Sequence, residues 1–222
     1  MKPLVAETQD VRTLQELGRA SVQIVHDLKN QLNGLKLYAT FLRKRMEKSE
    51  RPVDEQETIG KLIAGLERAA ADMTALVRYG RPVELRRQPG VDLVKVISNV
   101  AASEGVYFEA ATPTIEGDLD ATSITEALKA ITTGALHLGQ VDGGGALLIH
   151  IRKDEDAGAP SALIEWRGVK SNDAHDHFHS FAGSDALRMS LAAKIIEAHG
   201  GEAGQATSTL RVRLPLKERD EG

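Results

Sequence analysis

The side chains best suited to chemistry stand close together in the run His26-Asp27-Leu28-Lys29-Asn30. Apolar residues recur around this run at intervals of three, four and seven, which predicts a long amphipathic helix; they are Leu14, Leu17, Ile24, Leu28, Leu32, Leu35 and Leu42. At ~100° per residue His26 lies about 160° from Leu28, so we expect its imidazole to face solvent. An exposed imidazole beside the Asp27 carboxylate, with the Asn30 amide one turn along, predicts a nucleophile site. The plainer alternative is a polar histidine on a solvated helix face.

Two long helices must position this run. Residues 8–48 read as the first helix, and Pro52 breaks the pattern because proline cannot continue a helix interior. Asp54 is the predicted N-cap of a second helix that ends near Gly80. A single hairpin of this size cannot bury both apolar stripes, whereas two hairpins from two chains would form a four-helix bundle. We therefore predict a homodimer through residues 8–80, within a first domain of residues 1–80.

A second domain is predicted over residues 91–217, after a proline- and arginine-rich linker at 81–90 and before a tail at 218–222. Helices are expected at 91–102, 120–138 and 185–198, and strands at 106–108, 114–115, 146–152, 162–167 and 210–216. Helices mixed with mostly antiparallel strands indicate a two-layer α+β sandwich. The fold class is therefore α plus α+β: a helical hairpin followed by a sheet domain.

Composition limits the classes of function. A content of 41% hydrophobic and 27% charged residues is typical of a globular protein. The net charge of −4 gives no reason to expect a nucleic-acid partner, and the lack of cysteine excludes disulfides and thiolate metal sites. The sequence has no apolar run of transmembrane length and no signal segment, so we expect a cytoplasmic protein without a membrane anchor.

A hairpin carrying His-Asp-x-x-Asn ahead of an α+β domain resembles the sensor histidine kinase family. The resemblance implies that His26 is the phosphorylated histidine, that Asp27 is the acid following it, and that Asn30 is the polar residue associated with dephosphorylating a partner. Gln31 stands where the family usually has a proline. The C-terminal run Ala193 to Gly201 also resembles the last helix of the family and its closing His-Gly-Gly.

The nucleotide-binding residues of that family are missing. Gly134 stands at the position of the magnesium-ligating asparagine, and the strand expected to end in Asp-x-Gly-x-Gly reads Trp166-Arg167-Gly168-Val169-Lys170. The Gly-Leu-Gly-Leu segment that lets backbone approach phosphates is replaced by Ala186-Leu187-Arg188-Met189. We take Gly134, Arg167 and Arg188 as the degenerate nucleotide-site positions, so the resemblance predicts no cofactor bound by this chain.

What remains resembles the degenerate relatives that act as histidine phosphotransferases in phosphorelays. The resemblance implies that His26 shuttles a phosphoryl group between aspartates of response regulator receiver domains without ATP. The receiver would bring Mg²⁺, and catalysis would consist mainly of positioning and charge compensation. Lys29 could offset phosphate charge as an auxiliary residue, or be an ordinary solvated lysine.

Two other readings stay open. The chain could be a non-catalytic pseudokinase dimer that binds or sequesters a response regulator; an active histidine kinase or a response-regulator phosphatase ranks below both. The cluster His175-Asp176-His177-Phe178-His179 could place three imidazoles on one side for zinc or nickel. Because it lies where the family has its variable lid, we expect no metal site there.

Overall fold

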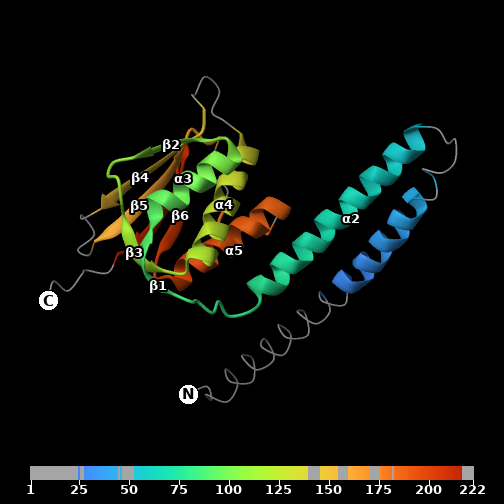
Figure 1. Ribbon diagram of the computed structural model, residues 1–222, viewed down its shortest axis with the longest axis horizontal. Coiled ribbons are helices and arrows are strands. Elements are labelled where there is room, and N and C mark those ends of the chain that lie inside the picture. Colours follow the sequence, from blue (N-terminus) through green and yellow to red (C-terminus); the bar gives the residue numbers. More distant parts are fainter. Residues whose placement is uncertain are drawn as a thin grey trace, which may run out of the picture. The chain divides into compact units, whose positions relative to one another are not determined.

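The structure of the protein is a computed structural model, and it describes residues 25, 28–44, 46, 53–139, 146–154, 160–170, 176–181 and 183–216. The chain divides into two compact units, residues 1–82 and 83–222. Figure 1 shows the helices and strands and labels most of them.

The described part of the first unit is helical up to Tyr79. Residues 28–44 form one helix and α2 spans Val53–Tyr79. Within this unit Ala39 and Ile63 are buried, and Lys36 Nζ lies 2.8 Å from Glu67 Oε1. Helix α2 starts at Val53, one residue before Asp54. Asp54 therefore lies in the first turn of α2 and is not the N-cap we predicted. None of the helices in the described ranges has the length and apolar content needed to span a membrane.

The second unit alternates helices with short strands. Its elements are β1 (Gln88–Asp92), α3 (Leu93–Glu104), β2 (Tyr107–Ala110), β3 (Glu116–Leu119), α4 (Ala121–Leu138), β4 (Leu148–Asp154), β5 (Ser161–Arg167), α5 (Ser184–Ala198), β6 (Glu202–Ala206) and β7 (Thr209–Pro215). Residues 88–90, predicted as linker, belong to β1, which pairs antiparallel with β3. Neither β1 nor β6 was predicted, because Gln-Pro-Gly-Val-Asp and Glu-Ala-Gly-Gln-Ala lack the alternation of apolar residues that marks a strand.

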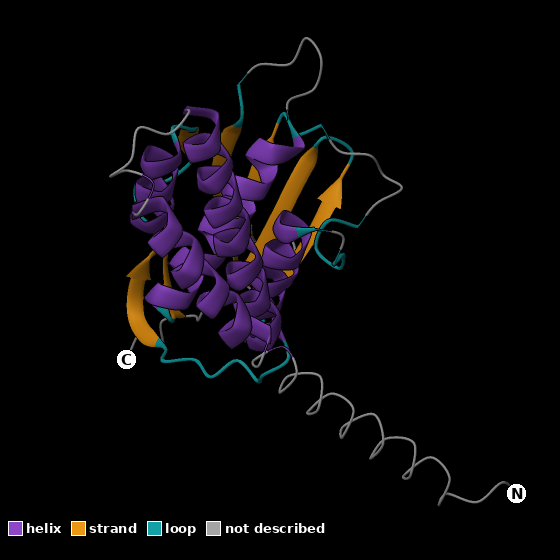
Figure 2. Cartoon of the chain, turned by 90° about the vertical axis from the view of Figure 1, so that its right-hand side faces the viewer, coloured by secondary structure: helices purple, strands orange, loops and turns teal. Residues whose placement is uncertain are grey.

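The main sheet has five strands in the order β2-β4-β5-β7-β6. Strands β2 and β4 are parallel and the other neighbours are antiparallel. Helices α3, α4 and α5 cover one face of this sheet, which we call the inner face (Figure 2). The mixed helix-and-sheet class expected from the sequence is therefore present in this unit as two layers.

The core lies between the inner face and the three helices. Strands contribute alternate residues to it, all with at most 1% exposure: Ile149 and Ile151 from β4, Ala162, Ile164 and Trp166 from β5, and Leu210, Val212 and Leu214 from β7. This alternation follows from the two-residue period of a strand. Local signals fix the helix ends, because the Asp92 carboxylate accepts N–H bonds at the start of α3 and Gly105, at φ 67°, ends it.

Candidate functional site

Part of the histidine run lies on the described helix 28–44. His26 and Asp27 fall outside the described residues. Asn30 is exposed and Lys29 is half-buried, so these two neighbours lie in different surroundings on the same helix. The surface that bears Asn30 is therefore open to a partner.

Two large apolar side chains continue the face of Asn30. Leu37 lies seven residues further along and Phe41 four residues after that, which keeps all three on one side of a helix. Leu37 is 58% exposed and Phe41 is 67% exposed. By the same spacing His26 precedes Asn30 by four residues. Leu37 and Phe41 thus form an exposed apolar surface on the Asn30 side of this helix.

Trp166 occupies the inner face at the end of β5, where the kinase resemblance would place an aspartate. Its side chain is fully buried, and its Nε1 donates a hydrogen bond of 2.9 Å to Thr132 Oγ1 on α4. The Thr132 hydroxyl in turn donates to the Leu128 carbonyl at 2.8 Å. The one polar atom of the indole is therefore satisfied within the core, and a large apolar ring fills the place of a small acceptor.

Gly134 lies against α5, where the resemblance would place a magnesium-ligating asparagine. A Cβ atom added to Gly134 would stand 2.5 Å from Met189 Sδ and 2.8 Å from its Cγ. Both residues are buried. The glycine thus allows α4 and α5 to pack closely, and the volume that an asparagine side chain would need is held by Met189.

The segment replacing the phosphate-approaching glycines is already helical. Helix α5 begins at Ser184, and the Leu187 N–H donates to the Gly183 carbonyl at 3.1 Å. Leu187 is buried and Arg188 half-buried, both inside the helix. At its start α5 is also tied to α4, since His137 Nδ1 lies 2.8 Å from Asp185 Oδ2. From Leu187 onward the amides of this segment are used within the helix and are not available to bind phosphate.

Arg167 lies on the opposite, outer face of the sheet. Because neighbouring strand residues alternate between faces, Arg167 points away from Trp166 and from the helices. Its Nη2 lies 2.6 Å from Glu165 Oε2. Of the three degenerate positions chosen from the sequence, Gly134 and Arg188 lie on the helices that would face a nucleotide, whereas Arg167 lies apart from both.

The histidine cluster forms a turn packed beside α5. The Asp176 carboxylate accepts the Phe178 and His179 N–H groups and lies 2.8 Å from His179 Nδ1. Phe178 is buried, and Ser190 Oγ of α5 donates to the Ser180 carbonyl at 2.8 Å. His175 lies outside the described residues, and among those described no group of three metal-binding side chains is arranged to hold a metal ion.

His199 joins the ends of α4 and α5 inside the core. Its Nε2 accepts the Asp120 N–H at 3.1 Å, and its Nδ1 lies 2.8 Å from the Ile195 carbonyl oxygen. Burial lowers the pKa of the His199 ring below its usual value, since the charged form would lose hydration. The neutral imidazole acts here as a structural link between the two helices.

Comparisons with known proteins show the fold. No protein-family profile matches the chain, and no curated protein matches its sequence. Histidine kinase AdeS of Acinetobacter baumannii has a similar structure, with a TM-score of 0.56, 15% identity, and coverage of 85% of this chain and 97% of that one. The ATP-binding domain of PrrB from Mycobacterium tuberculosis aligns with 60% of this chain and 99% of its own, at 18% identity and a TM-score of 0.46. The chain thus has a fold like that of AdeS.

Some residues that shape these surroundings were not singled out from the sequence. Thr132 and Met189 are ordinary helix residues in sequence, and only their packing against Trp166 and Gly134 gives them a role. Trp166 could have been found, because it alone replaces the aspartate of the quoted motif with a ring too large for a ligand site. The spacing of charged residues in the strands carries a further signal, because alternate strand positions lie on one face of a sheet. The charged residues at such positions are Arg152, Asp154, Glu165, Arg167, Arg211 and Arg213.

Proposed function

We propose that the chain is a histidine phosphotransferase of a two-component phosphorelay, in which His26 carries the phosphoryl group and ATP is not used. The observation that carries this proposal is the packing of Trp166 on Thr132 and of Met189 on Gly134. These contacts leave neither an acceptor for adenine nor an oxygen for magnesium at the positions that the resemblance assigns to them. The AdeS-like fold and the His-Asp-x-x-Asn run supply the rest of the support.

The reaction needs little from this chain beyond a positioned imidazole. An unprotonated ring nitrogen of His26 attacks the phosphorus of an aspartyl phosphate on the receiver, a P–N bond forms, and the P–O bond to the aspartate breaks. The aspartate leaves as a free carboxylate, and the reverse sequence passes the phosphoryl group to a second receiver. An exposed histidine of ordinary pKa, near 6.5, is largely neutral at about pH 7 and so can act as the nucleophile.

The neighbours of His26 have separate roles in this proposal. The Asp27 carboxylate holds the N–H of the ring and orients its other nitrogen. The Asn30 amide donates to a phosphoryl oxygen, and Lys29 offsets part of its charge. Leu37 and Phe41, both exposed, provide the apolar surface that a receiver covers when it docks. Mg²⁺ comes with the receiver, where it neutralises the acyl phosphate.

A second copy of the chain completes the hairpin in this proposal. Leu28, Leu35 and Leu42 repeat every seven residues, and all are at least 40% exposed. Tyr38, on the same side, is 69% exposed. At ~100° per residue Leu35 lies about 160° from Leu37, so the side that pairs with a second copy is separate from the side that receives a partner. The dimer is a four-helix bundle, which buries these leucines.

The test is transfer of label from a panel of receivers phosphorylated in advance. We expect acid-labile phosphate on the wild-type chain and none on His26→Ala. Leu37→Lys combined with Phe41→Lys leaves His26 in place and reduces transfer by weakening docking. Label that persists in His26→Ala contradicts the proposal. Receiver binding without any transfer favours the alternative of a non-catalytic pseudokinase dimer. The packing of Met189 on Gly134 is equally compatible with that alternative.

A further inference from the structure

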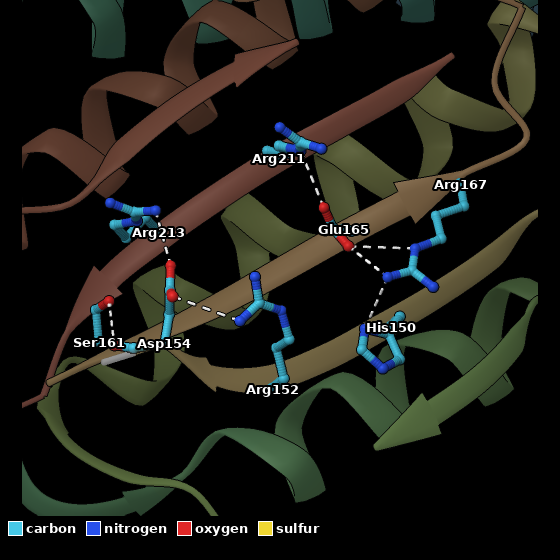
Figure 3. Close-up of polar contacts among 8 residues, drawn as sticks. All are labelled: His150, Arg152, Asp154, Ser161, Glu165, Arg167, Arg211 and Arg213. Carbon is cyan, nitrogen blue, oxygen red and sulfur yellow. Dashed lines mark hydrogen bonds and ion pairs between the residues drawn. The ribbon is translucent and has the colours of Figure 1, made fainter. Parts of the chain in front are cut away.

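The outer face of the main sheet carries an ordered set of arginines. Residues at alternate positions point to this face (Figure 3): His150 and Arg152 from β4, Glu165 and Arg167 from β5, and Arg211 and Arg213 from β7. In the described part of residues 83–222, no helix covers this face (Figure 1). We call Arg152, Arg167, Arg211 and Arg213 the arginine face.

Two buried carboxylates hold these arginines in place. Glu165, with only 8% of its side chain exposed, accepts from Arg167 at 2.6 Å and from Arg211 Nε at 2.9 Å. Asp154, with 3% exposed, lies 2.7 Å from Arg213 Nη2 and 3.4 Å from Arg152 Nη1. Each carboxylate thus joins two guanidinium groups. Each of the four arginine side chains remains 40–52% exposed.

The bound arginines keep donors for a partner. Burial alone would raise the pKa of Glu165, but hydrogen bonds and charge from Arg167 and Arg211 outweigh it and hold the pKa below the usual value. Glu165 therefore stays ionised and fixes the guanidinium planes. An arginine that is already ordered loses less conformational entropy when it binds. Among the described residues Arg211 donates to Glu165 through Nε, so its terminal N–H groups are not used in this ion pair.

The cations of this face are of the type favoured in protein interfaces. They are all arginine, which is enriched in protein–protein interfaces, whereas lysine is depleted there. The register places Leu163 between Arg152 and Arg213, and this leucine is only 6% exposed although no helix covers it. Arginine stems beside a leucine form an apolar floor beneath charged tips.

The charges around the arginine face define the partner. Four guanidinium groups outnumber the two central carboxylates, within a chain of net charge −4. At the sheet edges Glu109 stands opposite His150, and Glu202 stands opposite Arg213. A long phosphate backbone would have to cross these edge carboxylates, whereas a compact acidic surface fits between them. Arginine pairs with carboxylates in bidentate geometry.

We propose that the arginine face is a docking surface for an acidic segment of another protein, whose carboxylates pair with Arg152, Arg167, Arg211 and Arg213. This contact is separate from phosphoryl transfer at His26. It adds a second attachment point on the sheet unit, and its existence does not depend on the transfer reaction.

The test is binding of a fluorescent oligoglutamate peptide to the full chain, at low and at physiological ionic strength. Arg152→Gln with Arg211→Gln removes one arginine from each carboxylate and leaves each with its shortest ion pair, to Arg213 and Arg167. We expect about ten-fold weaker binding, corresponding to about 1.4 kcal/mol. Lys95→Gln with Lys129→Gln, on the helical side of the same unit, is the matched control and keeps wild-type affinity.

Additional variants and a second probe distinguish the proposal from its alternatives. Arg152→Lys with Arg211→Lys retains charge and tests bidentate geometry; we expect an intermediate affinity, and thermal unfolding confirms that each variant is folded. The proposal is contradicted if peptide affinity falls equally in Arg152→Gln with Arg211→Gln and in the control Lys95→Gln with Lys129→Gln. It is also contradicted if the wild-type chain does not bind the peptide. A single-stranded DNA probe that binds more tightly than the peptide, and depends on the same arginines, also overturns it in favour of nucleic acid.

Discussion

The two units of the chain place their large apolar side chains differently. The sheet unit buries most of them, with Trp166, Ile164 and Leu210 at zero exposure, whereas the hairpin leaves Leu35, Leu37, Tyr38 and Phe41 more than half exposed. A unit that buries its core needs no partner for stability, but a hairpin with such surfaces does. The difference is one of burial: the sheet unit has a closed core, whereas the hairpin exposes the apolar side chains that the proposed dimer would cover.

The largest effect is expected where the hairpin pairs with a second copy. Leu35→Lys with Tyr38→Lys removes four apolar side chains from a symmetric interface, each contributing about 1.5 kcal/mol or more, so dimerisation should weaken by at least about ten-thousand-fold. Sedimentation equilibrium measures this change. Leu37→Lys with Phe41→Lys makes a matched change on the other side of the helix and should leave the dimer intact. A dimer that survives both pairs would contradict the assignment of faces.

The next effect concerns the core of the sheet unit. Trp166→Ala opens a cavity and leaves the Thr132 hydroxyl without its indole partner, so we expect a loss of about 3–5 kcal/mol in the free energy of unfolding. Urea unfolding followed by circular dichroism measures it. Tyr107→Ala, at a side chain 68% exposed, is the control and should change stability by no more than about 0.5 kcal/mol. Similar losses in both variants would mean that Trp166 is not the centre of this core.

Substitutions at one glycine in each unit should change stability in opposite directions. Gly134→Asn forces a side chain against Met189 and should cost about 1–3 kcal/mol, with part of the loss recovered when Met189→Ala is added. Gly65 of α2 has open space around its Cβ position, so Gly65→Ala should stabilise the hairpin by up to about 1 kcal/mol. Thermal unfolding measures both. If Gly65→Ala lowered the unfolding temperature, or Gly134→Asn left it unchanged, the contrast between an open glycine in the hairpin and a close-packed glycine in the sheet unit would be wrong.

The smallest effect is a pH dependence confined to the sheet unit. Because burial lowers the pKa of His199 in the folded chain, the unfolded chain takes up this proton first, and stability should fall as the pH drops below about 6.5. Arg87 and Asp120 are the charged groups acting on this ring. Unfolding midpoints at about pH 7.5 and about 5.5 measure the drop. His199→Gln should reduce it, and His137→Gln, at an exposed histidine, should not.

Sequence predicted the elements that have strong local signals. The period of Ile124, Leu128 and Ile131 gave α4 to within a residue, and the alternation in β4, β5 and β7 gave those strands closely. Strands β1 and β6 were missed because pairing with β3 and β7, and not residue type, makes them strands. At the candidate site, residue types alone led to the prediction that Gly134, Arg167 and Arg188 replace nucleotide ligands, and that stays a prediction. What fills the space could not be predicted from the sequence, since Met189 and Thr132 gain their roles only through contacts between distant elements.

The central claim is that this chain receives phosphate from a receiver and not from ATP. The most direct measurement offers the wild-type chain labelled Mg–ATP in one reaction and a labelled phosphoreceiver in another, with His26→Ala in parallel. The account predicts acid-labile label only from the receiver, and only when His26 is present. Label from ATP alone would contradict it, and would mean that the packing around Trp166 and Gly134 opens to admit a nucleotide.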